Sequence, residues 1–182
     1  MARKIKIAFD LDGILIDKPP FISKGLLEWL FKGSDGERLH YRFPKTKLEQ
    51  LVRKLSHFYL FRPAIKENIE VVKRLAKDKR YELYVVSGRY SFLEKETYNW
   101  LKRAGIKNCF KKIFLNLGDS QPHLYKEQTL AFLKPDIFID DDDLIADFLA
   151  GKFPEVKIFC CFDRGEKCRK AKFINQLTEI TS

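Results

Sequence analysis

The chain has 182 residues, of which 45% are hydrophobic, and a formal net charge of +10 at pH 7. This length suits one α/β domain with an insertion, and no apolar stretch approaches the ~20 residues that a membrane-spanning helix requires. Because the amino terminus runs straight into a strand pattern without a leader segment, we expect a cytoplasmic protein with no membrane partner. The surplus of basic residues favours an anionic partner, although lysine-rich helix faces also occur in proteins that have none.

The first predicted strand, about residues 4–10, ends in an acidic pair, Asp10 and Asp12, followed by Gly13. Open α/β sheets carry their chemistry at the carboxyl ends of strands, and a glycine lets the chain turn there. Two carboxylates at this place predict a site that binds a hard cation through oxygen and leaves one carboxylate to react. A calcium loop would need oxygen ligands at its fifth and twelfth positions, where this chain has apolar residues. The plainest alternative is a strand end that begins a turn.

The segment of about residues 18–60 interrupts the alternation of strands and helices. Its apolar residues recur at helical spacing over residues 21–32 and again from Leu48 through Leu55, which predicts two helices. Because the segment directly follows the acidic pair, we expect a cap that excludes water and selects the substrate, with an ordinary two-helix crossover as the alternative. The segment also mixes cations with aromatic rings, which would suit a phosphate and a stacked base. The same mixture describes a plain amphipathic surface. The residues are Arg38, His40, Tyr41, Arg42, Lys45 and Lys47.

The rest of the chain alternates strands with helices, which predicts a mostly parallel sheet covered on both faces. A helix is expected to begin near Pro63, since proline is favoured at the first helical position, and Gly105 is placed to end the next helix. Cys160 and Cys161, expected to be reduced thiols, should point to opposite faces of a strand. Strands are expected at about residues 81–86, 113–115, 137–139 and 156–162, and helices at about residues 63–77, 92–104, 125–133, 144–149 and 167–177.

Three further groups of reactive residues follow predicted strands or open a helix: Ser87 with Gly88, Lys126, and the acidic run that begins at Asp140. With the acidic pair, this ordered set resembles the haloacid dehalogenase-like superfamily of hydrolases and phosphatases. The paired aspartates and the short helical cap look most like the branch containing 5'-nucleotidases that act on deoxyribonucleotides. The resemblance implies a three-layer Rossmann-like core with a parallel sheet, formed by residues 1–17 and 61–182, and a small helical type-1 cap at residues 18–60.

The resemblance also implies roles for the matched residues. Asp10 would attack phosphorus and form an aspartyl-phosphate, and Asp12 would act first as general acid and then as general base. Ser87 would donate a hydrogen bond to a phosphoryl oxygen, with the backbone at Gly88 beside it, unless it only caps a turn. Lys126 would neutralise the phosphoryl group or Asp10, and Lys134 is the alternative for this position.

A phosphate dianion repels a carboxylate nucleophile, so the resemblance implies Mg²⁺ as cofactor. Its ligands would be a carboxylate oxygen of Asp10, the backbone carbonyl of Asp12 and a carboxylate of the later run. Asp141 is favoured as the direct ligand, with Asp140 holding it in place. The last two aspartates of the run are expected to favour the positive end of the following helix, or, for Asp143, to steady a metal-bound water.

These residues predict an Mg²⁺-dependent phosphomonoesterase whose substrate is a nucleotide or another small phosphoester, with Arg42 as a contact from the cap. Dehalogenase chemistry does not need the second acid of the pair, so the presence of Asp12 argues against it. The alternative from another class is a catalytically idle module of the same fold that binds nucleic acid or protein through its basic surface. The sequence indicates no particular oligomeric state.

Overall fold

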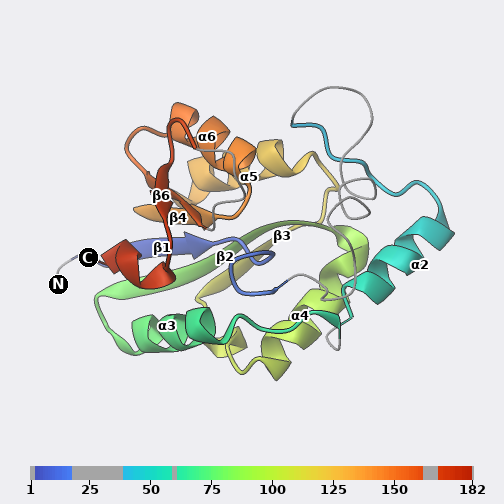
Figure 1. Ribbon diagram of the computed structural model, residues 1–182, viewed down its shortest axis with the longest axis horizontal. Coiled ribbons are helices and arrows are strands. Elements are labelled where there is room, and N and C mark those ends of the chain that lie inside the picture. Colours follow the sequence, from blue (N-terminus) through green and yellow to red (C-terminus); the bar gives the residue numbers. More distant parts are fainter. Residues whose placement is uncertain (1–2, 18–38, 59–60, 162–167, 182) are drawn as a thin grey trace.

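The computed structural model describes residues 3–17, 39–58, 61–161 and 168–181. In this part of the chain, a six-stranded sheet has the order β3-β2-β1-β4-β5-β6, and all of its neighbouring strands are parallel (Figure 1). The predicted Rossmann-like α/β fold is therefore confirmed. The strands are β1 Ile5–Phe9, β2 Tyr81–Tyr90, β3 Lys112–Asn116, β4 Ile137–Asp140, β5 Lys157–Cys161 and β6 Lys172–Ile174.

Helices cover both faces of the sheet, with α3 and α4 on one side and α5 and α6 on the other (Figure 1). Alternate side chains of β1 enter the two resulting cores: Ile7 and Phe9 pack under α3 and α4, and Ala8 under α5 and α6. Cys160 and Cys161 also belong to different cores, as their adjacent places in a strand predict. The helices are α2 Lys47–Ser56, α3 Lys66–Lys77, α4 Glu94–Arg103, α5 Pro122–Leu133 and α6 Asp143–Lys152, with short 3-10 helices η2 Ser91–Leu93, η3 Lys107–Cys109 and η4 Leu177–Thr181.

The helix expected to begin near Pro63 begins later, at Lys66. The intervening residues are extended because they pair with the chain that follows the acidic pair. The amide of Asp17 donates to the carbonyl of Pro63 at 2.8 Å, and the amide of Ile65 donates to the carbonyl of Leu15 at 3.0 Å. Backbone pairing with a distant segment thus outweighs the local preference of proline for a helix start.

The helix expected at residues 167–177 is wrong, because the described part of this segment forms β6 and η4. β6 adds a parallel edge strand to β5, with Cys161 opposite Ile174. Ahead of it, the Asp147 carboxylate accepts hydrogen bonds from three consecutive backbone amides, at 2.7, 2.8 and 2.9 Å: those of Arg169, Lys170 and Ala171. These contacts hold the chain in a turn that leads into the strand.

Of the predicted cap at residues 18–60, the structure describes residues 39–58. The helix expected at residues 21–32, together with Arg38, lies outside the described residues. The helix expected over Leu48–Leu55 is confirmed as α2, and a capping box between Thr46 and Glu49 fixes its start. Its apolar face is nevertheless open, with Leu51 52% and Val52 46% exposed. Within the described part of the chain, no helix has the length and apolar character needed to cross a membrane.

Candidate active site

The acidic pair and the acidic run meet at the carboxyl edge of the sheet, between β1 and β4. Asp10 directly follows β1, and its amide donates to the carbonyl of Ile139 in β4 at 2.9 Å. Asp10, Asp140 and Asp141 each offer a carboxylate oxygen, and these oxygens lie within 4.8 Å of one another. Sheet order reverses between these two strands, the place where open α/β sheets bind their ligands. The structure thus brings together three of the four predicted metal-site residues through their side chains.

Gly13 makes room for this cluster. Its φ is +74°, and a Cβ built on it would lie 2.0 Å from Oδ2 of Asp141. Any other residue would therefore collide with the carboxylate and strain the backbone as well. Glycine in this turn lets the loop of the acidic pair lie directly against the acidic run.

Lys126 reaches the cluster from α5 and is buried with it. Its Nζ lies 2.6 Å from Oδ2 of Asp140 and 3.3 Å from Oδ1 of Asp10. Burial alone would lower the pKa of Lys126, but the nearby carboxylates of Asp10 and Asp140 raise it above its ordinary value. The side chain therefore stays a cation. Lys134, the alternative from the sequence, is exposed and ends α5 in a left-handed conformation with a φ of 48°.

The cluster carries more negative than positive charge. Burial raises the pKa of Asp10 well above its ordinary value, Lys126 opposes this, and three neighbouring carboxylates add to it. Burial also raises the pKa of Asp140, again against Lys126. Carboxylates that resist ionising side by side are stabilised by a divalent cation, and a donor set made only of oxygen suits Mg²⁺. The residues present therefore fit a magnesium ion, which Asp10, Asp140 and Asp141 could hold.

The two candidates for the direct ligand differ in their contacts. Asp140 is fully buried, with Oδ2 accepting from Lys126 and Oδ1 from the amide of Asp142 at 3.2 Å. Asp141 is only partly buried, and it faces the space beside Gly13. This difference favours Asp141 as the metal ligand, as the sequence does, whereas the contacts of Asp140 are with Lys126 and the amide of Asp142.

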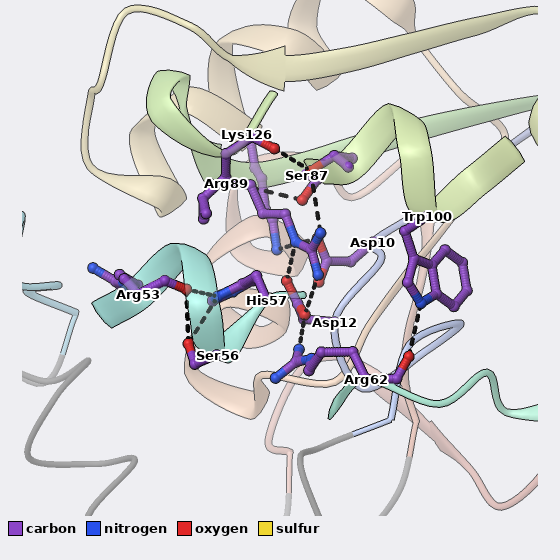
Figure 2. Close-up of polar contacts among 12 residues, drawn as sticks. Asp10, Asp12, Arg53, Ser56, His57, Arg62, Ser87, Arg89, Trp100 and Lys126 are labelled. Atoms are coloured by element: carbon purple, nitrogen blue, oxygen red, sulfur yellow. Dashed lines mark hydrogen bonds and ion pairs between the residues drawn. The ribbon is translucent and has the colours of Figure 1, made fainter. Parts of the chain in front are cut away.

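Two arginines that the sequence motifs did not include hold Asp12 (Figure 2). Arg89 donates from Nε to Oδ2 at 2.7 Å and from Nη2 to Oδ1 at 2.8 Å, while its Nη1 donates to Thr97 at 3.1 Å. Arg62 forms an ion pair with Oδ1 of Asp12, and Trp100 fixes its backbone carbonyl through a 2.8 Å hydrogen bond. Burial alone would raise the pKa of Asp12, but the positive charges of Arg89 and Arg62 hold it well below its ordinary value. Asp12 is therefore ionised in this arrangement.

The sequence offered a signal for only one of these arginines. Arg89 directly follows Ser87 and Gly88, and β2 runs on through it to Tyr90, further than the strand predicted to end at residue 86. Arg62 follows the 18–60 segment, where no local pattern marks it. Only the folded chain brings Arg62 beside Asp12.

Ser87 is buried in β2, at the same edge of the sheet. Its Oγ accepts from the amide of Arg89 at 3.4 Å, a contact of the kind that a turn residue makes. A Cβ on Gly88 would lie 2.8 Å from Cβ of Pro122, at the start of α5. Glycine thus lets the end of β2 pack closely against the helix that carries Lys126.

Residues 39–43, in the described part of the predicted cap, form a strap beside the acidic run. The backbone of Tyr41 exchanges two hydrogen bonds with the side chain of Gln121, at 2.9 and 3.2 Å, and its hydroxyl donates to Asp142. Asp142 also accepts from the first amides of α6, which confirms the helix-end role expected for it. Arg42, expected to contact substrate, is exposed and pairs with Glu49 on the cap helix, so the structure does not bring it to the carboxylate cluster.

At the end of α2, His57 lies toward Asp12 (Figure 2), whereas Arg53 donates from Nη1 to the carbonyl of Arg42 at 3.0 Å. His57 is buried, and its Nδ1 lies 2.8 Å from the carbonyl of Arg53. Burial, Arg89 and Arg62 lower the pKa of His57 well below its ordinary value, so its ring is neutral near pH 7. Asp12 is thus surrounded by basic residues from three parts of the chain.

Comparison with known proteins gives structural matches alone: no protein-family model matches the chain, and no curated protein matches it. A haloacid dehalogenase-like family hydrolase from Streptococcus pneumoniae is similar, with a TM-score of 0.60 and 16% identity over 98% of this chain and 97% of that one. CbbY from Rhodobacter sphaeroides, in complex with phosphate, has a TM-score of 0.65 and 14% identity over 98% and 96% of the two chains. An archaeal beta-phosphoglucomutase from Pyrococcus sp. strain ST 04 has a TM-score of 0.56 and 14% identity over 97% and 94%. At these identities the matches establish the fold, which is the one that the four motifs predicted.

Proposed function

We propose that the chain is an Mg²⁺-dependent phosphomonoesterase that works through an aspartyl-phosphate on Asp10. The observation that carries this proposal is the meeting of Asp10, Asp140 and Asp141, with carboxylate oxygens within 4.8 Å of one another, around the buried cation of Lys126. A strand end alone would not need three buried ionisable groups, Asp10, Lys126 and Asp140, since each costs free energy to remove from water. The fold shared with a haloacid dehalogenase-like hydrolase supports the same reading.

The proposed reaction gives Asp10 and Asp12 the roles that the family resemblance implies. Asp10 attacks the phosphorus atom, and the ester oxygen leaves with its electron pair and takes a proton from Asp12. Asp12 then accepts a proton from water, whose oxygen attacks the phosphorus of the aspartyl-phosphate and releases inorganic phosphate and free Asp10. When bound, Mg²⁺ supplies the positive charge that lets a carboxylate approach a phosphate dianion.

The surrounding residues prepare these two carboxylates. Lys126 favours the ionised form of Asp10, which is the form that attacks. Arg89 and Arg62 orient Asp12 and favour its ionised form, which suits the step in which it takes a proton from water. For the first step these ion pairs would have to loosen as the substrate binds, so that Asp12 can carry a proton.

The substrate that we propose is a nucleotide or another small phosphoester. The strap at residues 39–43 carries the aromatic ring of Tyr41 and lies beside the acidic run through its contact with Asp142. The net charge of +10 favours anionic substrates in general. Ser87 and the backbone at Gly88 would bind the phosphoryl oxygens, and a small substrate would enter between the strap and the sheet edge.

A phosphatase screen in excess Mg²⁺ tests this function. It covers nucleoside monophosphates, sugar phosphates and p-nitrophenyl phosphate, with Asp10→Asn as the inactive variant and Asp78→Asn, which alters an exposed ion pair with Arg80, as the matched control. Turnover by the wild type and the control, and background rates in Asp10→Asn, are expected. Comparable turnover by Asp10→Asn would remove the nucleophile from this account. If the wild type is inactive on every ester and binds nucleic acid with an affinity that falls steeply with salt, the idle binding module is correct instead.

A further inference from the structure

Two buried arginines share the single carboxylate of Asp12 (Figure 2). Arg89 meets it with two hydrogen bonds and directs its remaining nitrogen to Thr97, so its donors and its charge are matched. Arg62 adds a second positive charge to the same carboxylate. The side chains of Arg62 and Arg89 are only 6% and 4% exposed, so water screens this surplus poorly.

Arg62 has hydrogen-bonding capacity that the described residues leave unused. Its Nε is buried and has no hydrogen-bond partner among the residues that the structure describes. Its backbone is fixed by Trp100, so the guanidinium is held in place from behind. Buried donors and buried cations without partners cost free energy, which is recovered when a ligand supplies the missing acceptor and charge.

In the part of the chain that the structure describes, the other charged groups around Arg62 and Asp12 do not supply that negative charge. His57 is neutral, and Arg53, which donates to the carbonyl of Arg42, is a further cation. Asp141 is the second carboxylate that acts on Arg62, but the proposed function assigns this residue to the metal. The surplus charge therefore lies next to Asp12, the residue that the proposed reaction places beside the leaving group.

We propose that Arg62 binds a second anion carried by the leaving group, so that the preferred substrates are phosphomonoesters with a further phosphate near the scissile ester. This rests on the proposed function, in which Asp12 protonates the leaving oxygen and so lies beside that group. A guanidinium matches a phosphate well because its fork of N–H donors can meet two oxygens. Bisphosphorylated small molecules and phosphorylated oligonucleotide ends share this chemistry, and both are sources of such a substrate.

The test compares kcat/KM for matched substrates that differ in the second phosphate. Adenosine 3'-monophosphate is paired with adenosine 3',5'-bisphosphate and with a 3'-phosphorylated dinucleotide, and glucose 6-phosphate is paired with glucose 1,6-bisphosphate. The wild type should prefer the substrates with the second anion by roughly 10- to 100-fold, as a charged hydrogen bond allows. Arg62→Gln should bring this ratio close to one, Arg62→Lys should keep part of it, and Arg80→Gln, an exposed control, should leave it unchanged. Because general damage lowers both rates of a pair, the ratio reports on the second anion alone.

A ratio near one in the wild type, or a ratio that survives in Arg62→Gln, would overturn the role of Arg62 while leaving the phosphatase proposal intact. The dinucleotide arm separates the sources, since preference for it over the bisphosphate indicates an oligonucleotide end. Calorimetric binding of adenosine 3',5'-bisphosphate and adenosine 3'-monophosphate is measured in parallel. If no ester is turned over, the phosphatase proposal fails, and binding still decides: tighter binding of the bisphosphate that is lost in Arg62→Gln supports the second-anion site, and equal binding refutes it.

Discussion

Replacing Lys126 with Met tests whether this lysine is the charge that makes the buried carboxylates tolerable. The substitution keeps most of the side-chain volume and removes the cation that lies 2.6 Å from Asp140 and 3.3 Å from Asp10. Removing one partner of a buried ion pair costs about 3–5 kcal/mol, because the remaining charges stay buried. For a chain of this size, that loss corresponds to a fall in Tm of about 6–20 °C.

Lys111→Met is the matched control. Lys111 contacts Glu82 at 2.8 Å, a distance like that in the buried pair, but its side chain is 60% exposed. Exposed pairs contribute about 0–1 kcal/mol. The free energy of unfolding, measured by urea denaturation in EDTA, should therefore fall several times further in Lys126→Met than in Lys111→Met.

The pH dependence separates lost charge from lost packing. Without Lys126, the folded-state pKa values of Asp10 and Asp140 rise further above their unfolded values, because burial already raises both. A group whose pKa is higher in the folded than in the unfolded protein contributes its full stability below the unfolded pKa. That contribution is lost as pH rises through the folded pKa. The difference in stability between wild type and Lys126→Met should therefore shrink from neutral pH to about pH 5. Equal losses in both lysine variants, or a difference that widens in acid, would refute the reasoning.

Three further predictions concern other parts of the site and fold. Gly13→Ala should lower the free energy of unfolding by at least about 1–2 kcal/mol, the cost of a left-handed alanine, and should weaken calorimetric Mg²⁺ binding by displacing Asp141; unchanged Mg²⁺ affinity would contradict this. Asp147→Ala should cost about 1–3 kcal/mol in urea denaturation. Burial alone would raise the pKa of Asp147, but hydrogen bonds from three backbone amides lower it. The stability lost in Asp147→Ala should therefore have its full size above the unfolded pKa and should vanish as pH falls through the folded pKa. A loss of stability that stays constant in acid would contradict this. EDTA should abolish ester turnover and Mg²⁺ should restore it, whereas full activity in EDTA would remove the metal from the account.

Strand-end spacing in the sequence was sufficient to predict the carboxylate cluster, but not the lysine. Asp10, Asp140 and Asp141 follow apolar strands, and parallel strands bring their carboxyl ends to one edge, so spacing along the chain was enough to place them together. Lys126 required the family resemblance, because a lysine on a helix has many ordinary explanations. The structure then distinguished it from Lys134 by burial and by its contacts with two carboxylates.

Arg62 and the last strand were beyond the reach of local patterns. Arg62 gains its place from the pairing of residues 63–65 with the turn after Asp12, a contact between segments far apart in the sequence. β6 was mistaken for part of a helix because its apolar residues are few and its strand is short. It forms because β5 offers an edge and Asp147 holds the preceding amides, and neither feature is visible in the residues of β6 themselves.

The most direct test of the central claim is chemical trapping of the aspartyl-phosphate. The enzyme is quenched in acid during turnover with Mg²⁺ and an active ester, then treated with borohydride, which reduces an acyl phosphate to an alcohol, and its peptides are mapped by mass spectrometry. Conversion of Asp10 to homoserine is expected in the wild type during turnover, and none without substrate. Active enzyme with unmodified Asp10, or with the modification on another carboxylate, would contradict the account.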